Sequence, residues 1–190
     1  MTYYEHEDFT DLKMENETIS NLELEDCRFL SCELQSVRFH NCRFVDCTFS
    51  ECLAENPVFD CCSMSGSIFT SCRLLGIDWE TLSGGFVGPI ERLENCLLKY
   101  NNFVNGEFPR FTFSGNEILD SLFGSCNLTR CDFSSCHLNK TEFFQCDLSG
   151  TDFTCADGYS VDISNCQLKG AVFSYPDVIN LLNGLGIIIK

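Results

Sequence analysis

The sequence predicts a right-handed β-solenoid, and three observations point to it. Apolar residues recur at every fifth position, cysteines occupy one phase of that repeat, and large side chains recur every twenty residues. Helices and flat strands do not give a period of five, because their side-chain periods are about 3.6 and 2. With 190 residues, the chain is long enough for one such domain and too short for two full domains to be expected.

The apolar series runs in two parts. The first extends from Phe9 to Trp79, and the second extends from Leu93 to Phe173, with Gly158 as its one interruption before Ile163. Fifteen of the eighteen phenylalanines belong to these parts. We expect the core to contain two columns of stacked rings, since a narrow core must be filled without voids. These columns are Phe9, Phe29, Phe49 and Phe69, and Phe113, Phe133, Phe153 and Phe173.

Thirteen of the fifteen cysteines lie two residues before an apolar centre, and only Cys61 and Cys155 are out of phase. A reduced cysteine is small and readily buried, so it can fill a second inward slot in each repeat. We prefer this interpretation to a disulfide scaffold or a zinc site. Cys61 and Cys62 do not form a CxxC pair, and no histidine accompanies them. We therefore expect no metal and no cofactor.

Several repeats have a small residue, then Asp, then Leu or Phe, as in Cys131-Asp132-Phe133, Cys146-Asp147-Leu148 and Thr151-Asp152-Phe153. This pattern covers residues 7–173 and resembles pentapeptide-repeat proteins. The resemblance implies a quadrilateral β-helix with four pentapeptides per coil and about eight coils. The centre and the residue two before it would point inward, and the other three would point outward. We expect this β-helix over residues 1–173.

The rhythm slips by one residue within the 80–92 segment, because Leu93 comes one position earlier after Trp79 than a period of five requires. Gly84-Gly85 and Gly88-Pro89 are turn signals there. We interpret the segment either as a bulge that joins two stacks or as a recognition loop, since loops on rigid scaffolds often carry binding residues. Phe86 lies outside the core phase and is our aromatic candidate for contact with a partner.

Residues 174–190 depart from the repeat. Pro176, followed by spaced apolar residues and Gly184, predicts a short helix, and the final isoleucines predict a terminal strand. Both would cap the solenoid. The region from Phe173 to Asn183, with 156–163 and 75–79, resembles the gyrase-interacting branch of the family. That branch includes the Qnr quinolone-resistance, microcin B17 immunity and albicidin-resistance proteins. The resemblance implies a homodimer interface made by Val178, Leu181, Leu182, Ile187, Ile188 and Ile189.

The chain is acidic, with 12 Lys and Arg against 28 Asp and Glu, a net charge of −16. This balance argues against direct nucleic-acid binding, which needs basic residues. Residues 1–80 hold 16 acids and 5 bases, and residues 5–26 hold nine of those acids. In the second half, acids recur just before the centre, where Asp or Asn is common in any pentapeptide repeat. From these we select Glu107, Asp132, Glu142, Asp147, Asp152 and Asp162 as candidates for partner binding.

Charge and resemblance together predict a DNA mimic that binds a type II topoisomerase, DNA gyrase or topoisomerase IV, and modulates or protects it against gyrase-directed toxins or antibiotics. The alternative is a structural or scaffolding solenoid with an unrelated protein partner. No histidine belongs to a nucleophile motif and no phosphate-binding glycine loop occurs, so we expect no enzyme. The sequence has neither a membrane-length apolar stretch nor a signal peptide, and we expect a cytoplasmic protein.

Overall fold

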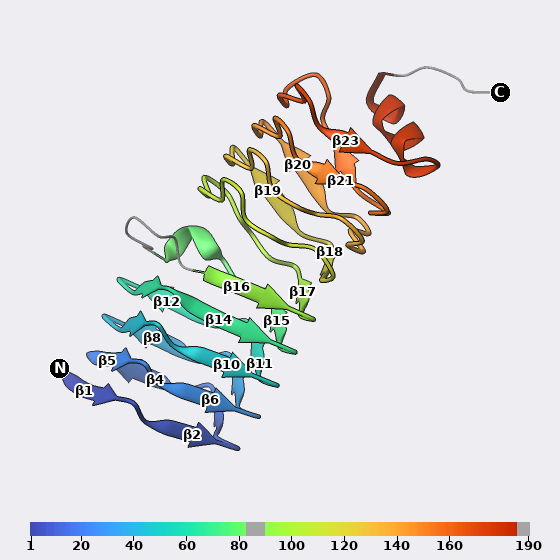
Figure 1. The fold of residues 1–190 in the computed structure, drawn as a ribbon. Coiled ribbons are helices and arrows are strands. Elements are labelled where there is room, and N and C mark those ends of the chain that lie inside the picture. The colour runs from blue at the N-terminus through green and yellow to red at the C-terminus, as the bar shows by residue number, and fades with distance from the viewer. Residues whose placement is uncertain (83–89, 186–190) are drawn as a thin grey trace. The chain divides into compact units, whose positions relative to one another are not determined.

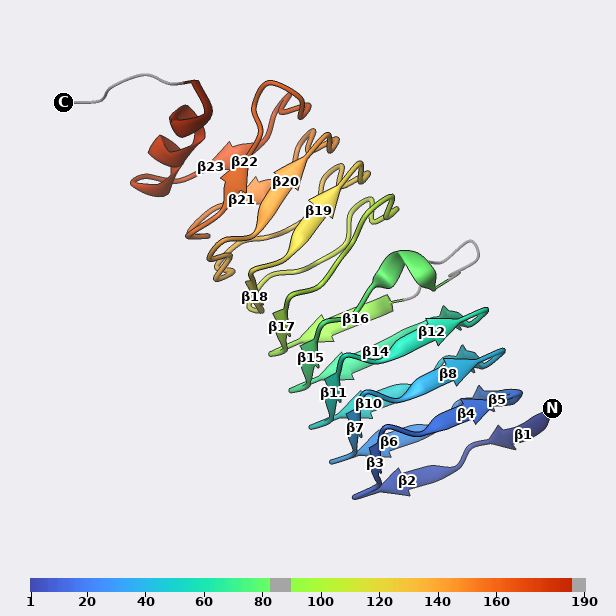
Figure 2. The same ribbon diagram turned by 180° about the vertical axis from the view of Figure 1, so that it is seen from behind.

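The computed structural model describes residues 1–82 and 90–185, and it confirms the β-solenoid, with about eight turns of short parallel strands (Figures 1 and 2). The chain divides into two compact units, Met1–Asn101 (unit 1) and Asn102–Lys190 (unit 2), and each is described by itself. No helix in the described ranges is long and apolar enough to span a bilayer.

Unit 1 consists of four parallel sheets. The first contains β1 (Thr2–Glu5), β5 (Leu22–Glu25), β9 (Arg43–Val45) and β13 (Ser63–Ser65). The second contains β2 (Asp8–Thr10), β6 (Arg28–Leu30), β10 (Thr48–Ser50), β14 (Ser67–Thr70) and β16 (Ile90–Glu94). The third contains β3 (Lys13–Glu15), β7 (Glu33–Gln35), β11 (Leu53–Glu55), β15 (Arg73–Leu75) and β17 (Leu97–Lys99). The fourth contains β4 (Thr18–Ser20), β8 (Arg38–His40) and β12 (Val58–Asp60), and a 3-10 helix, η1 (Trp79–Thr81), follows β15.

Unit 2 has fewer regular strands, because many of its repeats pair through single bridges. Its strands are β18 (Glu117–Leu119), β19 (Leu122–Gly124), β20 (Glu142–Phe144), β21 (Asp152–Phe153), β22 (Ser160–Val161) and β23 (Val172–Phe173). β19, β20 and β22 form one parallel sheet, and β21 pairs with β23. The 3-10 helix η2 (Asp177–Leu185) ends the described chain and contacts β22.

The register explains the four sides. Phe9 pairs with Phe29, Phe29 with Phe49, and Phe49 with Phe69, so one coil takes twenty residues, or four repeats of five. Rings in this column stack with centroids 4.7 to 4.9 Å apart. Corners form at the second residue after most centres, where the backbone φ is positive. Most corner residues in unit 1 are Asn, Asp, Ser or Gly, which tolerate this left-handed conformation well.

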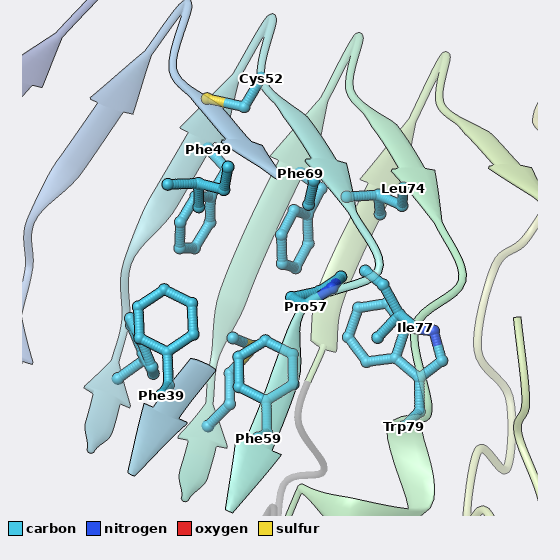
Figure 3. Close-up of a pocket in the computed structure, with 13 residues that line it drawn as sticks. Phe39, Phe49, Cys52, Pro57, Phe59, Phe69, Leu74, Ile77 and Trp79 are labelled. Carbon is cyan, nitrogen blue, oxygen red and sulfur yellow. The ribbon is translucent and has the colours of Figure 1, made fainter. Parts of the chain in front are cut away.

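The core is filled by the centres and by the residues two before them. Phe29, Phe49 and Phe69 are buried in unit 1, and Phe113, Phe133 and Phe153 are buried in unit 2. Phe173, in the last coil, is only half-buried. Unit 1 also contains an apolar cavity of about 40 Å³ between Phe39, Phe59, Phe69 and Trp79 (Figure 3). It lies beside Ala54, whose methyl group stands where other coils place larger side chains.

Two coils depart from twenty residues. Phe69 pairs with Leu93, so this coil is longer than the others, and its extra length falls in the region of the predicted slip. In unit 2, Phe143 pairs with Val161, so that coil is shorter than the others. The spacing predicts Ile163 as this centre, and that prediction is wrong because the coil is two residues short. Tyr159 fills the core there, 5.4 Å from Phe153 between ring centroids.

Candidate partner-binding surface

Five carboxylates lie along the strands and corners of the first sheet of unit 1. We call this side of unit 1 the acidic face, and its carboxylates are Glu5, Glu23, Glu25, Asp26 and Asp46. Each of them either flanks an apolar centre or lies at a corner. Side chains at these positions point outward, and none of the five is buried. Glu5 and Glu25 are direct partners in the ladder between β1 and β5. Like charges placed opposite each other destabilise a sheet, so this pair is not explained by stability.

Few cations offset this charge. Arg43 Nη1 lies 3.0 Å from Glu23 Oε1, and His6 lies 3.5 Å from Glu5 and 3.8 Å from Asp26. The Tyr3 hydroxyl donates a hydrogen bond of 2.9 Å to Glu25 Oε2. That hydrogen bond, together with the negative charge of Glu25 and Glu5, raises the pKa of Tyr3. With histidine neutral, the acidic face has five carboxylates and one guanidinium, a net charge of −4.

The third sheet of unit 1 has a different charge balance. Its strands hold three acids and three bases, a net charge of zero. Lys13 lies directly opposite Glu33, with its Nζ 2.7 Å from Glu33 Oε1. Acidity is therefore not spread evenly around unit 1. The sequence selection missed the acidic face, although the nine acids in residues 5–26 and a coil length of twenty would have placed Glu5 opposite Glu25.

Four of the acids selected from the sequence hold their own turns. In each case Oδ1 accepts a hydrogen bond from the backbone N–H two residues later: Asp132 from Ser134 at 2.8 Å, Asp147 from Ser149 at 2.9 Å, Asp152 from Thr154 at 2.7 Å, and Asp162 from Ser164 at 3.1 Å. All four are half-buried. These are Asx turns, in which a short acidic side chain satisfies a backbone donor. Each of these aspartates therefore has a local structural role, and partner binding by them stays a prediction.

The other selected candidates differ from these. Glu107 and Glu142 are exposed; Glu107 accepts a hydrogen bond from Asn127 Nδ2 at 2.8 Å, and Glu142 lies on β20. Phe86 lies outside the described residues. Glu142 is also the one selected glutamate that lines a groove.

The inward cysteines act as small core residues with weak donors. Cys131 and Cys136 donate to the carbonyl oxygens of Phe108 and Phe113 in the preceding coil, at 2.8 and 2.9 Å. Burial raises the pKa of both thiols to about 12, so they remain protonated at neutral pH. Cys61 and Cys155 are exposed corner residues. Over the ranges that the structure describes, no group of three or more His, Cys, Asp or Glu side chains could hold a metal.

The predicted dimer segment is only partly described. Val178, Leu181 and Leu182 lie on η2 and are half-buried, whereas Ile187, Ile188 and Ile189 lie outside the described residues. Exposed apolar side chains lie on η2 and shortly before it in the chain: Val172 is 49% exposed, Tyr175 81%, Ile179 37% and Leu185 50%.

Family comparisons agree with the repeat. The family model described as pentapeptide repeats (8 copies) matches residues 126–157 and 141–174. The chain is a pentapeptide-repeat protein. A second model, the SV2A/B/C luminal domain, matches residues 3–78 of this pentapeptide-repeat protein. No curated protein sequence matches this chain. Pentapeptide-repeat proteins are typically non-catalytic.

Solved structures of QnrB1 show the same fold. Two trypsin-treated variants of QnrB1, a plasmid-mediated fluoroquinolone resistance protein, have TM-scores of 0.53 and 0.52 and identities of 18% and 19%; each match covers 96% of this pentapeptide-repeat protein and 99% of the QnrB1 chain. HetL, a pentapeptide repeat protein involved in heterocyst differentiation regulation from the cyanobacterium Nostoc, has a TM-score of 0.41 and 12% identity, covering 89% of this chain and 86% of HetL. At such identities, the QnrB1 likeness establishes the fold alone.

Proposed function

We propose that this protein is a DNA mimic that binds a type II topoisomerase, DNA gyrase or topoisomerase IV, through the acidic face. Binding would modulate the enzyme or protect it against gyrase-directed toxins or antibiotics. The observation that carries the proposal is the Glu5–Glu25 pair, which places like charges together on a face with one guanidinium. The shared fold with QnrB1, a fluoroquinolone resistance protein, supports it.

The charge density suits this role. Four stacked coils span about 15 Å at the usual strand spacing. The acidic face therefore carries roughly one net charge per 4 Å, close to the ~3.4 Å between phosphates along one DNA strand. A basic DNA-binding surface would be attracted to such a row of carboxylates, and the attraction would weaken as salt increases.

A supercoiling assay tests the proposal. The protein is titrated into gyrase at low salt, with and without a gyrase poison. We expect inhibition of supercoiling or relief of the poison, and a loss of about tenfold in potency for the triple variant Glu5→Gln, Glu25→Gln, Asp26→Asn.

The matched control is Glu15→Gln, Glu33→Gln, Glu55→Gln, which removes the same formal charge from the neutral third sheet and should retain its potency. If both triple variants lose potency equally, the acidic face is not the contact surface. If the parent protein neither inhibits gyrase nor relieves the poison, the topoisomerase proposal is wrong, and a scaffolding role with another partner takes its place.

We also propose that residues 174–190 form a capping and dimerisation segment beyond the β-helix of residues 1–173. Four exposed apolar side chains around η2 support this proposal, because such a patch is costly to leave in water. Light scattering should give the mass of a dimer, and Ile179→Asp with Leu185→Asp should give a monomer. A monomeric parent protein would contradict the proposal.

A further inference from the structure

Unit 2 has an open groove of about 440 Å³ beside η2. It is lined by β20, by Gly158 and Tyr159, by β22 with Asp162, and by Asn180 of η2. The end of the short coil forms part of the groove wall. Val161 stands in line with Phe143, so this column ends on a smaller side chain than the phenylalanines before it. Gly158, with φ at +70°, passes so close to Asn139 that a Cβ would lie 2.8 Å from the Asn139 Cα.

The groove combines carboxylates with an exposed aromatic ring. Glu142 and Phe144 flank the centre of β20, so both point outward, about 7 Å apart along the strand. Phe144 is 43% exposed, which is unusual for a side chain of this size. Asp162 adds a second carboxylate, whose oxygens accept hydrogen bonds from the backbone N–H of Ser164 and from Asn165 Nδ2.

No lysine or arginine of the described residues pairs with these acids. The residues that line the groove include no lysine or arginine, and Glu142 has no ion pair within the parts of the chain that the structure describes. The groove is therefore a concave surface with unneutralised negative charge.

A buried hydroxyl also lacks a partner. Tyr159 lines the groove, is 3% exposed, and its hydroxyl has no hydrogen-bond partner among the described residues. Burial raises the pKa of Tyr159 to about 12, so the hydroxyl stays protonated at neutral pH. A buried polar group without a partner costs stability, and each such group needs an explanation. This hydroxyl is shielded from solvent, so it lies behind the surface of the open groove and does not itself contact a ligand there.

We propose that this groove binds an arginine side chain of a protein partner. The planar guanidinium would stack on the Phe144 ring and donate two hydrogen bonds to the Glu142 carboxylate, with Asp162 beside it. Arginine suits this site better than lysine, because its charge is spread over a flat, weakly hydrated group that pairs with carboxylates in bidentate geometry. The proposal does not depend on which protein the partner is.

Titration of the ¹⁵N-labelled full-length protein with N-acetyl-arginine amide, followed by NMR, tests this binding. We expect saturable shifts of the amides that line the groove. N-acetyl-citrulline amide has the same shape without the charge and should give no such shifts; N-acetyl-lysine amide should bind more weakly. Phe144→Leu should weaken binding about two- to fivefold, and Glu142→Gln about tenfold or more.

Glu117→Gln is the matched control, because Glu117 is an exposed glutamate at the same repeat position on β18 and should leave the affinity unchanged. Glu142→Asp, which keeps the charge, should bind better than Glu142→Gln and shows that loss of binding is not loss of folding. Equal shifts with citrulline, unchanged affinity in Glu142→Gln, or shifts spread over the acidic face as well as the groove would each overturn the proposal.

Discussion

Unit 1 and unit 2 build the same five-residue repeat with different turns. In unit 2, the backbone N–H of the third residue after a centre donates to the carbonyl of that centre, as from Cys136 to Phe133 at 3.2 Å and from Thr151 to Leu148 at 3.1 Å. In unit 1, the equivalent N–H groups of Cys32, Cys42 and Cys52 instead reach a cysteine sulfur in the next coil, each at 3.4 Å. Sulfur is a weak acceptor, so these unit 1 donors are less well satisfied.

The residue before the centre contributes to this difference. Unit 2 often has Asp or Asn there, and their side chains bond the next turn, whereas unit 1 mostly has Arg, Glu, Thr or apolar residues in short strands. Packing differs too, because unit 1 contains the cavity beside Ala54. Six phenylalanines of unit 2 are at most 1% exposed: Phe103, Phe113, Phe123, Phe133, Phe143 and Phe153. The same repeat pattern therefore permits two different qualities of backbone hydrogen bonding and of core packing.

The largest expected difference concerns a core ring. Phe133→Ala should lower the free energy of unfolding by about 3–5 kcal/mol, because Phe133 is fully buried between Phe113 and Phe153. Phe9→Ala should cost roughly 1–2 kcal/mol, since Phe9 is half-buried and its ring is stacked on one side only, by Phe29, with Tyr4 edge-on to it. Urea unfolding with amide hydrogen exchange measures both changes. Equal losses would show that the two cores are equally tight.

Much of the fold follows from spacing. A narrow solenoid leaves only two inward positions per repeat, so apolar residues must recur at five, and this periodicity is visible without any structure. The short coil could not be found in this way. Ile163 stays five residues before Leu168, so the period of five looks intact in the sequence. In the structure, the coil is two residues short at Val161, and the spacing of twenty is restored after Ser164. The sequence did contain one signal of the short coil: Tyr159 and Val161 are apolar residues at alternate positions directly after Gly158.

The candidate site was less predictable. Asp132, Asp147 and Asp152 attract notice in the sequence because their charge recurs, yet each is held by its own turn, and a single sequence does not separate local hydrogen bonding from recognition. The groove beside η2 depends on the short coil and on the helix packing against β22, so residues far apart in the sequence had to be placed before it could be found.

Enlarging a core alanine to valine should have a smaller effect, and the effect should have opposite signs in the two units. Ala54→Val should stabilise unit 1 by up to about 1 kcal/mol, because filling a cavity of about 40 Å³ recovers about 24 cal/mol per Å³. Ala156→Val should instead destabilise unit 2 by about 1–3 kcal/mol, since Ala156 is 2% exposed in a filled core. Thermal and urea unfolding measure both. Destabilisation by Ala54→Val would show that the cavity cannot accept the added methyl groups.

The smallest effect isolates the turn. Asp147→Ala should cost about 1 kcal/mol, because it leaves the Ser149 N–H without its carboxylate acceptor. Asp147→Asn should keep most of the stability, since the amide oxygen can accept the same bond. Glu117→Ala is the control: Glu117 occupies the same repeat position in an extended strand, and its loss should change stability by less than about 0.5 kcal/mol. If both alanine variants have equal effects in urea unfolding, charge before the centre stabilises unit 2, and the Asx bond does not distinguish its turns from those of unit 1.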